Sequence, residues 1–127
     1  MPGGRGFGQG RGQGGGWRKM FFLKSCLLVL LHREAGYGYS LMDGLKKFGF
    51  QSEQMDISIL YRALRGLEEA GLVVSSWSEE SLGPQRRMYT ITPQGEAALA
   101  EWIESLRRWR REIEALEAAY DAVKKGA

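Results

Sequence analysis

Two stretches decide the fold expected for this chain: residues 56–74 read DISILYRALRGLEEAGLVV, and residues 83–91 read GPQRRMYTI. In the first stretch, leucines recur at positions 60, 64 and 67, which is the spacing of one face of a helix. Asp56 is placed to cap the start of this helix, and Gly71 stands where helices commonly end in a left-handed residue. A β-branched run, a Gly-Pro turn and a second β-prone run follow, and together they predict a hairpin.

A second face of the same predicted helix is polar. At positions i, i+3, i+4 and i+7 it carries Ser58, Tyr61, Arg62 and Arg65. A helix with hydroxyl and guanidinium groups on one face, followed at once by a basic hairpin, is typical of a winged helix-turn-helix. In that fold the helix enters the major groove of DNA, where arginines contact guanine edges or phosphates, and the hairpin, or wing, reaches phosphates.

The wing supplies further candidate DNA contacts in Gln85, Arg86 and Arg87. Neighbouring residues of a strand point in opposite directions, so we expect only one of the two arginines to face DNA. Trp77 and Tyr89, one in each predicted strand, are expected to fill the core at the base of the wing.

Composition favours one folded domain. The chain has 127 residues, and 43% of them are hydrophobic, which suffices for a core. The formal charge is only +3, but residues 1–33 hold six Lys or Arg and no acid. A local basic face of this kind is compatible with nucleic-acid binding, because local potential matters more than the total charge. An incidental basic tail on an unrelated protein would give the same composition.

The sequence does not offer the residues of a catalytic or metal-binding site. Cys26 is the only cysteine and His32 the only histidine, so neither a disulfide framework, a cysteine zinc cluster nor a Cys-His catalytic pair is available. Cys26 stands in an apolar run and is expected to be a small buried side chain. That run is too short to span a bilayer, so we expect a cytoplasmic protein without cofactor or metal and with no membrane partner.

Residues 1–16 contain nine of the eighteen glycines, interspersed with arginine and glutamine. Glycine loses the most entropy on ordering, so this segment is expected to be a disordered tail. Residues 17–92 would then form the winged DNA-binding domain and residues 93–127 a dimerisation helix. The expected fold class is mainly α with a small β hairpin.

Two helices should precede the polar one. The first is expected from about Trp17 or Met20 to Arg33, and it is apolar nearly all round, so part of it needs cover from a partner chain. A turn at residues 36–39 leads to the second, from Leu41 to Phe48. Ser40, also a candidate DNA contact, is expected to cap it.

The last helix starts at a strong signal, because Thr92 can cap it and Pro93 suits its first position. Eight apolar residues then recur at alternating spacings of three and four, which is a heptad pattern. We call this set the C-terminal seam: Leu99, Trp102, Leu106, Trp109, Ile113, Leu116, Tyr120 and Val123. Such a seam requires another helix, and we expect its beginning to pack on the chain's first helix and the rest on a second copy.

The residues from about 30 to 102 resemble the PadR-type transcriptional regulators. The resemblance rests on GYSL at residues 38–41, on LYRAL and LEEAGLV within residues 60–73, and on RMYTITPQG at residues 87–95. It implies a homodimer that binds a palindromic operator in double-stranded DNA, and repression relieved by a small molecule or a stress signal. Tyr39 and Tyr61 match family positions that approach the DNA backbone. The glycine-arginine tail is not part of the family pattern.

An aromatic effector site is a further expectation, placed at the dimer centre between the first and last helices. The residues chosen for it are Phe21, Phe22, Trp102, Leu106 and Trp109. Aromatic surface of this kind suits a flat apolar molecule, and nearby arginines favour an anionic one. The alternative is that these side chains simply fill the core.

Two rival functions remain open from the sequence. In the first, the winged domain serves as a protein-interaction module; in the second, the glycine-arginine tail binds RNA without sequence preference. Salt-dependent binding to promoter DNA would distinguish a DNA-binding regulator from the protein-interaction module. Competition between RNA and duplex DNA would distinguish it from the RNA-binding protein.

Overall fold

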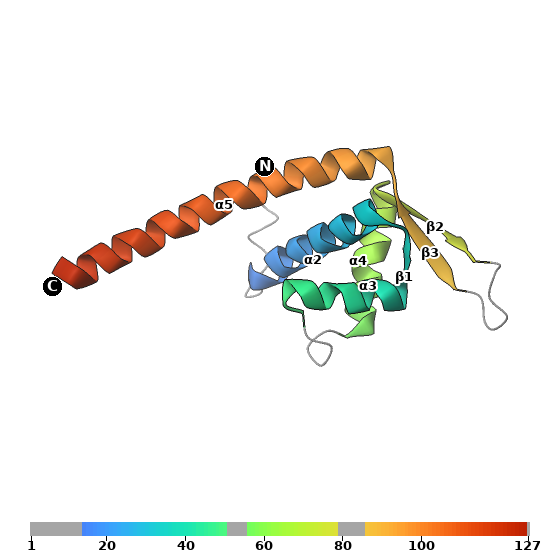
Figure 1. Ribbon diagram of the computed structural model, residues 1–127, viewed down its shortest axis with the longest axis horizontal. Coiled ribbons are helices and arrows are strands. Elements are labelled where there is room, and N and C mark those ends of the chain that lie inside the picture. Colours follow the sequence, from blue (N-terminus) through green and yellow to red (C-terminus); the bar gives the residue numbers. More distant parts are fainter. Residues whose placement is uncertain (1–13, 51–55, 79–85, 127) are drawn as a thin grey trace.

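The computed structural model describes residues 14–50, 56–78 and 86–126, and it has the expected class: a mainly helical chain with a small antiparallel sheet (Figure 1). A compact winged domain is followed by one long helix that extends away from it. The elements, in chain order, are α2 Gly14–Arg33, β1 Gly36–Tyr37, α3 Gly38–Gly44, the short 3₁₀ helix η1 Leu45–Phe48, α4 Ile57–Glu69, β2 Val73–Trp77, β3 Arg87–Ile91 and α5 Pro93–Gly126.

Helix α4 has the boundaries that its sequence predicts. The side chain of Asp56 accepts a hydrogen bond of 3.1 Å from the backbone N–H of Ser58, which satisfies one of the free donors of the first turn. After the helix, Gly71 adopts a left-handed conformation with φ of 79°. The predicted cap and the predicted stop are both confirmed.

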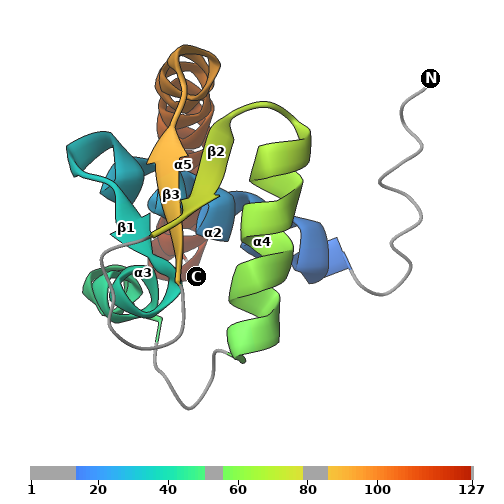
Figure 2. The same cartoon turned by 90° about the vertical axis from the view of Figure 1, so that its right-hand side faces the viewer.

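The sheet has three strands in the order β1-β3-β2, and both pairings are antiparallel. Strands β2 and β3 form the predicted hairpin, which lies beside α4 (Figure 2). Strand β1 was expected to be only a turn, but Gly36 pairs with Tyr89 and Tyr37 with Met88. The turn residues are extended here because the free edge of β3 offers them backbone partners.

The second helix begins earlier than expected, at Gly38, and Ser40 is therefore not its cap. Ser40 is instead the third helical residue, and its hydroxyl accepts a 3.0 Å hydrogen bond from the N–H of Tyr37. The expected single helix to Phe48 is also divided, because its last four residues form η1. Gly49, with φ of 91°, closes it as predicted.

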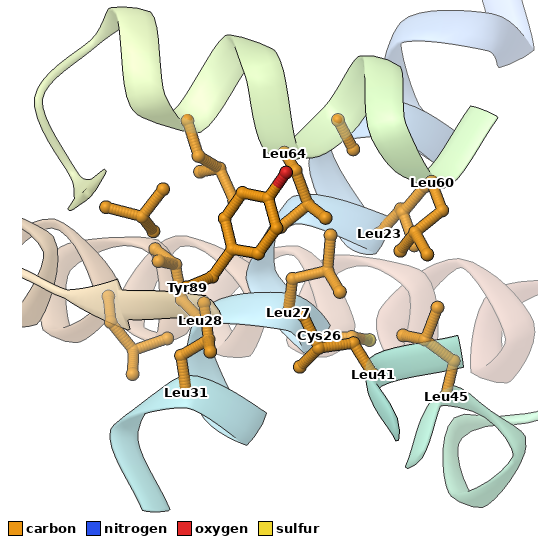
Figure 3. Close-up of a cluster of buried hydrophobic side chains, with 14 residues drawn as sticks. Leu23, Cys26, Leu27, Leu28, Leu31, Leu41, Leu45, Leu60, Leu64 and Tyr89 are labelled. Atoms are coloured by element: carbon orange, nitrogen blue, oxygen red, sulfur yellow. The ribbon is translucent and has the colours of Figure 1, made fainter. Parts of the chain in front are cut away.

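The core is built around α2, which lies between α5 on one side and α3 and α4 on the other (Figure 3). Buried leucines from α2, α3, η1 and α4 meet there together with Tyr89 of the sheet: Leu27, Leu28, Leu41, Leu45, Leu60, Leu64 and Leu67. Burying one such side chain stabilises the fold by about 1.5–3 kcal/mol relative to leaving it in water. Cys26 is 4% exposed in this cluster, and its burial raises the pKa of its thiol to about 12.

The long α5 begins as predicted, with Pro93 as its first residue and Thr92 before it. The hydroxyl of Thr92 accepts a 3.0 Å hydrogen bond from the N–H of Gly95. Its 34 residues span about 50 Å, and only the first part packs on α2 (Figure 1). Along the C-terminal seam, Leu99 is buried and Trp102 half-buried, whereas Leu116 is 69% exposed.

The first helix begins earlier than predicted: α2 starts at Gly14, three residues before Trp17, the earlier of the two expected starts. The boundary drawn at residue 16 therefore shifts, and three glycines belong to the helix. The remaining tail, residues 1–13, lies outside the described residues, as does the connection at 51–55.

Candidate nucleic-acid interface

A hollow of about 660 Å³ is lined by residues of α4, of β1 and the start of α3, and of the hairpin. We call it the wing hollow. Helix α4 forms one wall with four residues spaced by four, four and three, which is a single helix face. These are Ile57, Tyr61, Arg65 and Glu68; the opposite side is lined by Tyr37, Gly38, Tyr39, Trp77, Arg86, Arg87 and Tyr89.

Three guanidinium groups and one carboxylate line this hollow, so its formal charge is positive. Arg65 comes from α4, whereas Arg86 and Arg87 come from the wing, and all three are exposed. The structure thus brings together one of the two arginines predicted on the helix, Arg65, and both arginines predicted on the hairpin. Guanidinium groups converging from two elements are suited to phosphate oxygens, which they bind in bidentate fashion.

The two wing arginines are held by different aromatic side chains. Arg86 lies over the ring of Tyr39 at 5.0 Å, and its Nη1 donates a 3.0 Å hydrogen bond to the Tyr39 hydroxyl. Arg87 lies over the ring of Trp77 at 4.7 Å. Arg86 precedes β3 and Arg87 is its first residue, so the two do not share one regular strand. The expectation that only one faces DNA remains a prediction.

The two tyrosines chosen as backbone contacts both lie at the hollow. Tyr39 is 57% exposed and stacks on Tyr37 with ring centroids 5.6 Å apart. Tyr61 is 40% exposed, and its hydroxyl rests against Gly38, where any Cβ would overlap it. Glycine is therefore required at the start of α3 for this tyrosine to fit.

Other predicted DNA contacts lie away from the wing hollow. Arg62 does not line the wing hollow and instead lines a separate hollow with Lys19 of α2. Ser58 is exposed in the first turn of α4, and the Ser40 hydroxyl bonds the backbone of Tyr37. Gln85 lies outside the described residues.

Two residues of the wing hollow were not predicted from the sequence, and a third, Trp77, lies elsewhere than predicted. Ile57 is 47% exposed although it is apolar, and Glu68 places a carboxylate in the same wall. Trp77 was expected in the core but is 53% exposed, because it ends β2 beyond the helices that cover the sheet. Tyr89 is buried as predicted, and that burial raises the pKa of its hydroxyl.

Comparison with known proteins identifies the family. The model of the transcriptional regulator PadR-like family matches residues 27–101, which include α3, α4, the sheet and the start of α5. The chain belongs to this family. The resemblance noted in the sequence is thereby confirmed. No curated protein matches the chain.

Solved structures of similar proteins agree with the PadR-like assignment. A conserved protein of unknown function, described as a potential transcriptional factor, is 34% identical, with a TM-score of 0.69 over 82% of this chain and 91% of that one. A PadR-like transcription factor from Bacteroides fragilis is 26% identical, with a TM-score of 0.68 over 80% of this chain and 95% of that one. Bacillus subtilis PadR in complex with operator DNA is 25% identical, with a TM-score of 0.56 over 64% of this chain and 46% of that one.

The C-terminal seam of this PadR-like chain has a packed first part and an exposed second part. Its beginning packs on α2, where Phe21 and Trp102 have ring centroids 5.2 Å apart. From Trp109 onward the seam is exposed, with Tyr120 at 60% and Val123 at 71%. Exposing an apolar row of this length to water is unfavourable.

The residues predicted to bind an effector are only partly brought together. Phe21, Leu106 and Trp109 line a hollow of about 320 Å³ beside Arg18, whose guanidinium lies 5.1 Å from the Trp109 ring. Phe22 is elsewhere: it stacks on Phe50, with centroids 5.8 Å apart, and lines the hollow that contains Arg62. Adjacent helical residues are separated by about 100°, so Phe21 and Phe22 face different neighbours.

The described part of the chain contains neither a metal-ligand cluster nor a candidate membrane span. Within residues 14–50, 56–78 and 86–126, no three His, Cys, Asp or Glu side chains gather as metal ligands would. Among the helices of the same residues, none combines the length and the apolar character needed to cross a bilayer.

Proposed function

We propose that this chain is a homodimeric transcriptional repressor that binds a palindromic operator, with α4 in the major groove and the wing on adjacent phosphates. The observation that carries the proposal is the convergence of Arg65, Arg86 and Arg87 on one positive hollow. Helix-turn-helix proteins read base edges with the exposed face of their recognition helix and fix their register through phosphate contacts. We place such a regulator in the cytoplasm, together with the DNA that it binds.

The family gives independent support for the DNA-binding part of the proposal. Bacillus subtilis PadR, 25% identical to this chain, is known in complex with operator DNA. Its similarity to this chain covers 46% of its length, so the support concerns the shared winged region. We carry over the use of that region for DNA, and not the operator or its regulated gene.

Dimerisation is the second part of the proposal. The exposed half of the C-terminal seam, from Trp109 to Val123, is apolar and projects beyond the winged domain (Figure 1). Packing this row against a second copy removes it from water. A two-fold dimer presents two copies of α4, so its half-sites lie about one helical turn apart, ~10 bp or a multiple.

Release by a small aromatic effector is the third part. The hollow beside Phe21, Leu106 and Trp109 offers aromatic walls, and Arg18 favours an anionic ligand. Saturable quenching of Trp109 by planar aromatic acids, in a variant that keeps only this tryptophan, together with release of DNA, is the expected result. Ligands that do neither would leave these aromatics as packing residues.

One experiment tests the function as a whole: footprinting the protein on the DNA upstream of its own coding region, over a series of salt concentrations. A repressor protects a two-fold symmetric site, and its affinity falls steeply with salt because bound arginines release counterions from phosphates. A protein-interaction module would protect no site. An RNA-binding protein would lose the duplex to competing RNA, and deletion of the tail before α2, residues 1–13, would abolish that preference.

A further inference from the structure

A chain of side-chain contacts connects α4 to the wing, and both of its ends, Glu68 and Arg87, line the wing hollow. Ser75 of β2 donates a 2.8 Å hydrogen bond from its hydroxyl to Oε2 of Glu68. The same hydroxyl oxygen accepts a 2.9 Å hydrogen bond from Nε of Arg87. The donor and acceptor roles are consistent, because one hydroxyl supplies one proton and receives another.

A second contact holds the same arginine from the side. Trp77 and Arg87 are direct partners in the β2–β3 register, and the guanidinium carbon lies 4.7 Å from the indole centroid. Stacking occupies one face of the guanidinium, and the Ser75 bond occupies Nε. Among the described residues, no hydrogen bond engages the terminal Nη groups of Arg87, which are the atoms that would grip a phosphate in bidentate fashion.

Glu68 is unexpected in this setting. It lies in the wall of a hollow that we propose to face DNA, and a carboxylate there repels phosphates. Through-space charge therefore predicts that Glu68 weakens DNA binding. Its hydrogen bond to Ser75 supplies a reason for its presence that does not depend on attraction to DNA.

We propose that Glu68 is a positioning residue: acting through Ser75, it fixes Arg87 and with it the wing relative to the recognition helix, ready for a DNA phosphate. This inference rests on the proposed function, because it assumes that Arg87 contacts DNA. An arginine ordered before binding loses less side-chain freedom when the complex forms, and the wing keeps a constant distance from α4.

The first test compares two neighbouring acids whose removal has opposite expected effects. Glu68→Ala deletes the acceptor and should weaken binding to random-sequence duplex DNA by about two- to tenfold, the range typical of one lost hydrogen bond. Glu69→Ala removes the same charge from an exposed position that has no role in the contact chain, and it should bind as well as wild type or better. Glu68→Gln keeps an acceptor oxygen and loses the charge, so it should also bind at least as well.

The second test changes two serines of β2. Ser75→Ala should weaken binding like Glu68→Ala, whereas Ser75→Thr, which keeps the hydroxyl, and Ser76→Ala, on the exposed neighbour, should not. Glu68→Ala and Ser75→Ala remove no cation, so in both variants the slope of log affinity against log salt should equal that of wild type. Arg87→Ala, by contrast, should reduce that slope by about one unit.

The third test is a double-mutant cycle. In an Arg87→Ala background nothing remains to be positioned, so Glu68→Ala should no longer weaken binding and should instead strengthen it slightly. Equal weakening in both backgrounds would mean that Glu68 supports the fold rather than Arg87. Binding by Glu68→Ala equal to or tighter than that of wild type would overturn the proposal directly.

A DNA-free measurement separates failure of this inference from failure of the proposed function. In wild type, the Nε–H proton of Arg87 should exchange slowly with water by NMR, and Ser75→Ala should accelerate its exchange. Slow exchange with no duplex binding by wild type would refute the DNA-binding function while leaving the contact chain intact. Fast exchange in wild type, together with normal DNA binding, would refute the positioning role alone.

Discussion

Gly95 of α5 lies against the backbone of Leu72, so close that a Cβ on Gly95 would overlap the Leu72 carbonyl oxygen. The same carbonyl accepts a 3.0 Å hydrogen bond from the N–H of Thr92. The segment between α4 and β2 is therefore joined backbone to backbone to the start of α5. This junction sets the direction in which α5 leaves the winged domain.

Gly95→Ala should accordingly destabilise the protein. The overlapping atom belongs to backbone and has no rotamer to change, so relief requires the helix start to move. Overpacking of this kind costs about 1–3 kcal/mol, measurable as a lower urea midpoint. Gly126→Ala is the matched control, because a Cβ there meets nothing within 4 Å. Equal midpoints for the two variants would contradict the prediction.

Arg65→Ala should reduce affinity for the operator by about 1–3 kcal/mol if the arginine makes a bidentate contact to guanine. Its side chain lies on the wing side of α4, in the hollow that we propose to face DNA. Titration of operator and random duplex by fluorescence anisotropy measures the loss. Lys125→Ala, which removes one charge at the far end of α5, serves as the control.

The specific-site loss should exceed the loss on random duplex. Equal losses on both would identify Arg65 as a phosphate contact rather than a base contact. If Arg62→Ala and Arg65→Ala both bind like wild type, α4 is not the recognition helix.

Local signals predicted most of the fold. Asp56, Gly71 and Thr92 mark their boundaries through hydrogen bonds or backbone angles within a few residues, so the sequence contains the necessary information. The apolar period of α4 likewise predicts its buried face without reference to the rest of the molecule.

The site could be predicted only in part, because its geometry depends on contacts distant in sequence. Periodicity places Ser58 and Arg62 on the polar face of α4, but the position of the wing decides that Ile57 and Glu68 share its wall. The bond between Glu68 and Ser75, and the stacking of Arg86 on Tyr39, have no sequence signal of their own. The same holds for Phe22, which is turned away from Phe21 toward Phe50.

Leu116→Glu should convert the dimer to monomer or aggregate. Leu116 is 69% exposed in the single chain, so its seam position has no partner within the described residues that a charge would disturb. Light scattering coupled to size exclusion measures the mass. Ala118→Glu adds the same charge at a position outside the heptad seam and should remain dimeric. A Leu116→Glu variant that stays dimeric and binds DNA would exclude the C-terminal seam as the dimer interface.

Deletion of residues 1–13 should lower general DNA affinity without changing the preferred sequence. The segment carries two arginines, so its removal should reduce the salt slope by at most about two units per chain. Replacing Arg5 and Arg11 by alanine should reproduce the change, which isolates charge from chain length. A changed sequence preference in a selection from random duplexes would mean that the segment reads a groove.

Cys26 should make stability fall with alkaline pH. Its thiol is buried and keeps its proton up to a pKa of about 12, compared with an ordinary value of 9.0. Above pH 9 the unfolded chain releases this proton while the folded chain retains it, so rising pH favours unfolding.

The contribution of the Cys26 thiol is at most about 1.4 kcal/mol of unfolding free energy per pH unit, and it is absent below the ordinary pKa. Cys26→Ala removes this thiol and leaves every other side chain the same in both proteins. Urea unfolding between pH 8 and about pH 10.5 should therefore show a steeper decline for wild type than for the variant. Parallel curves would mean that the thiol reaches water without unfolding.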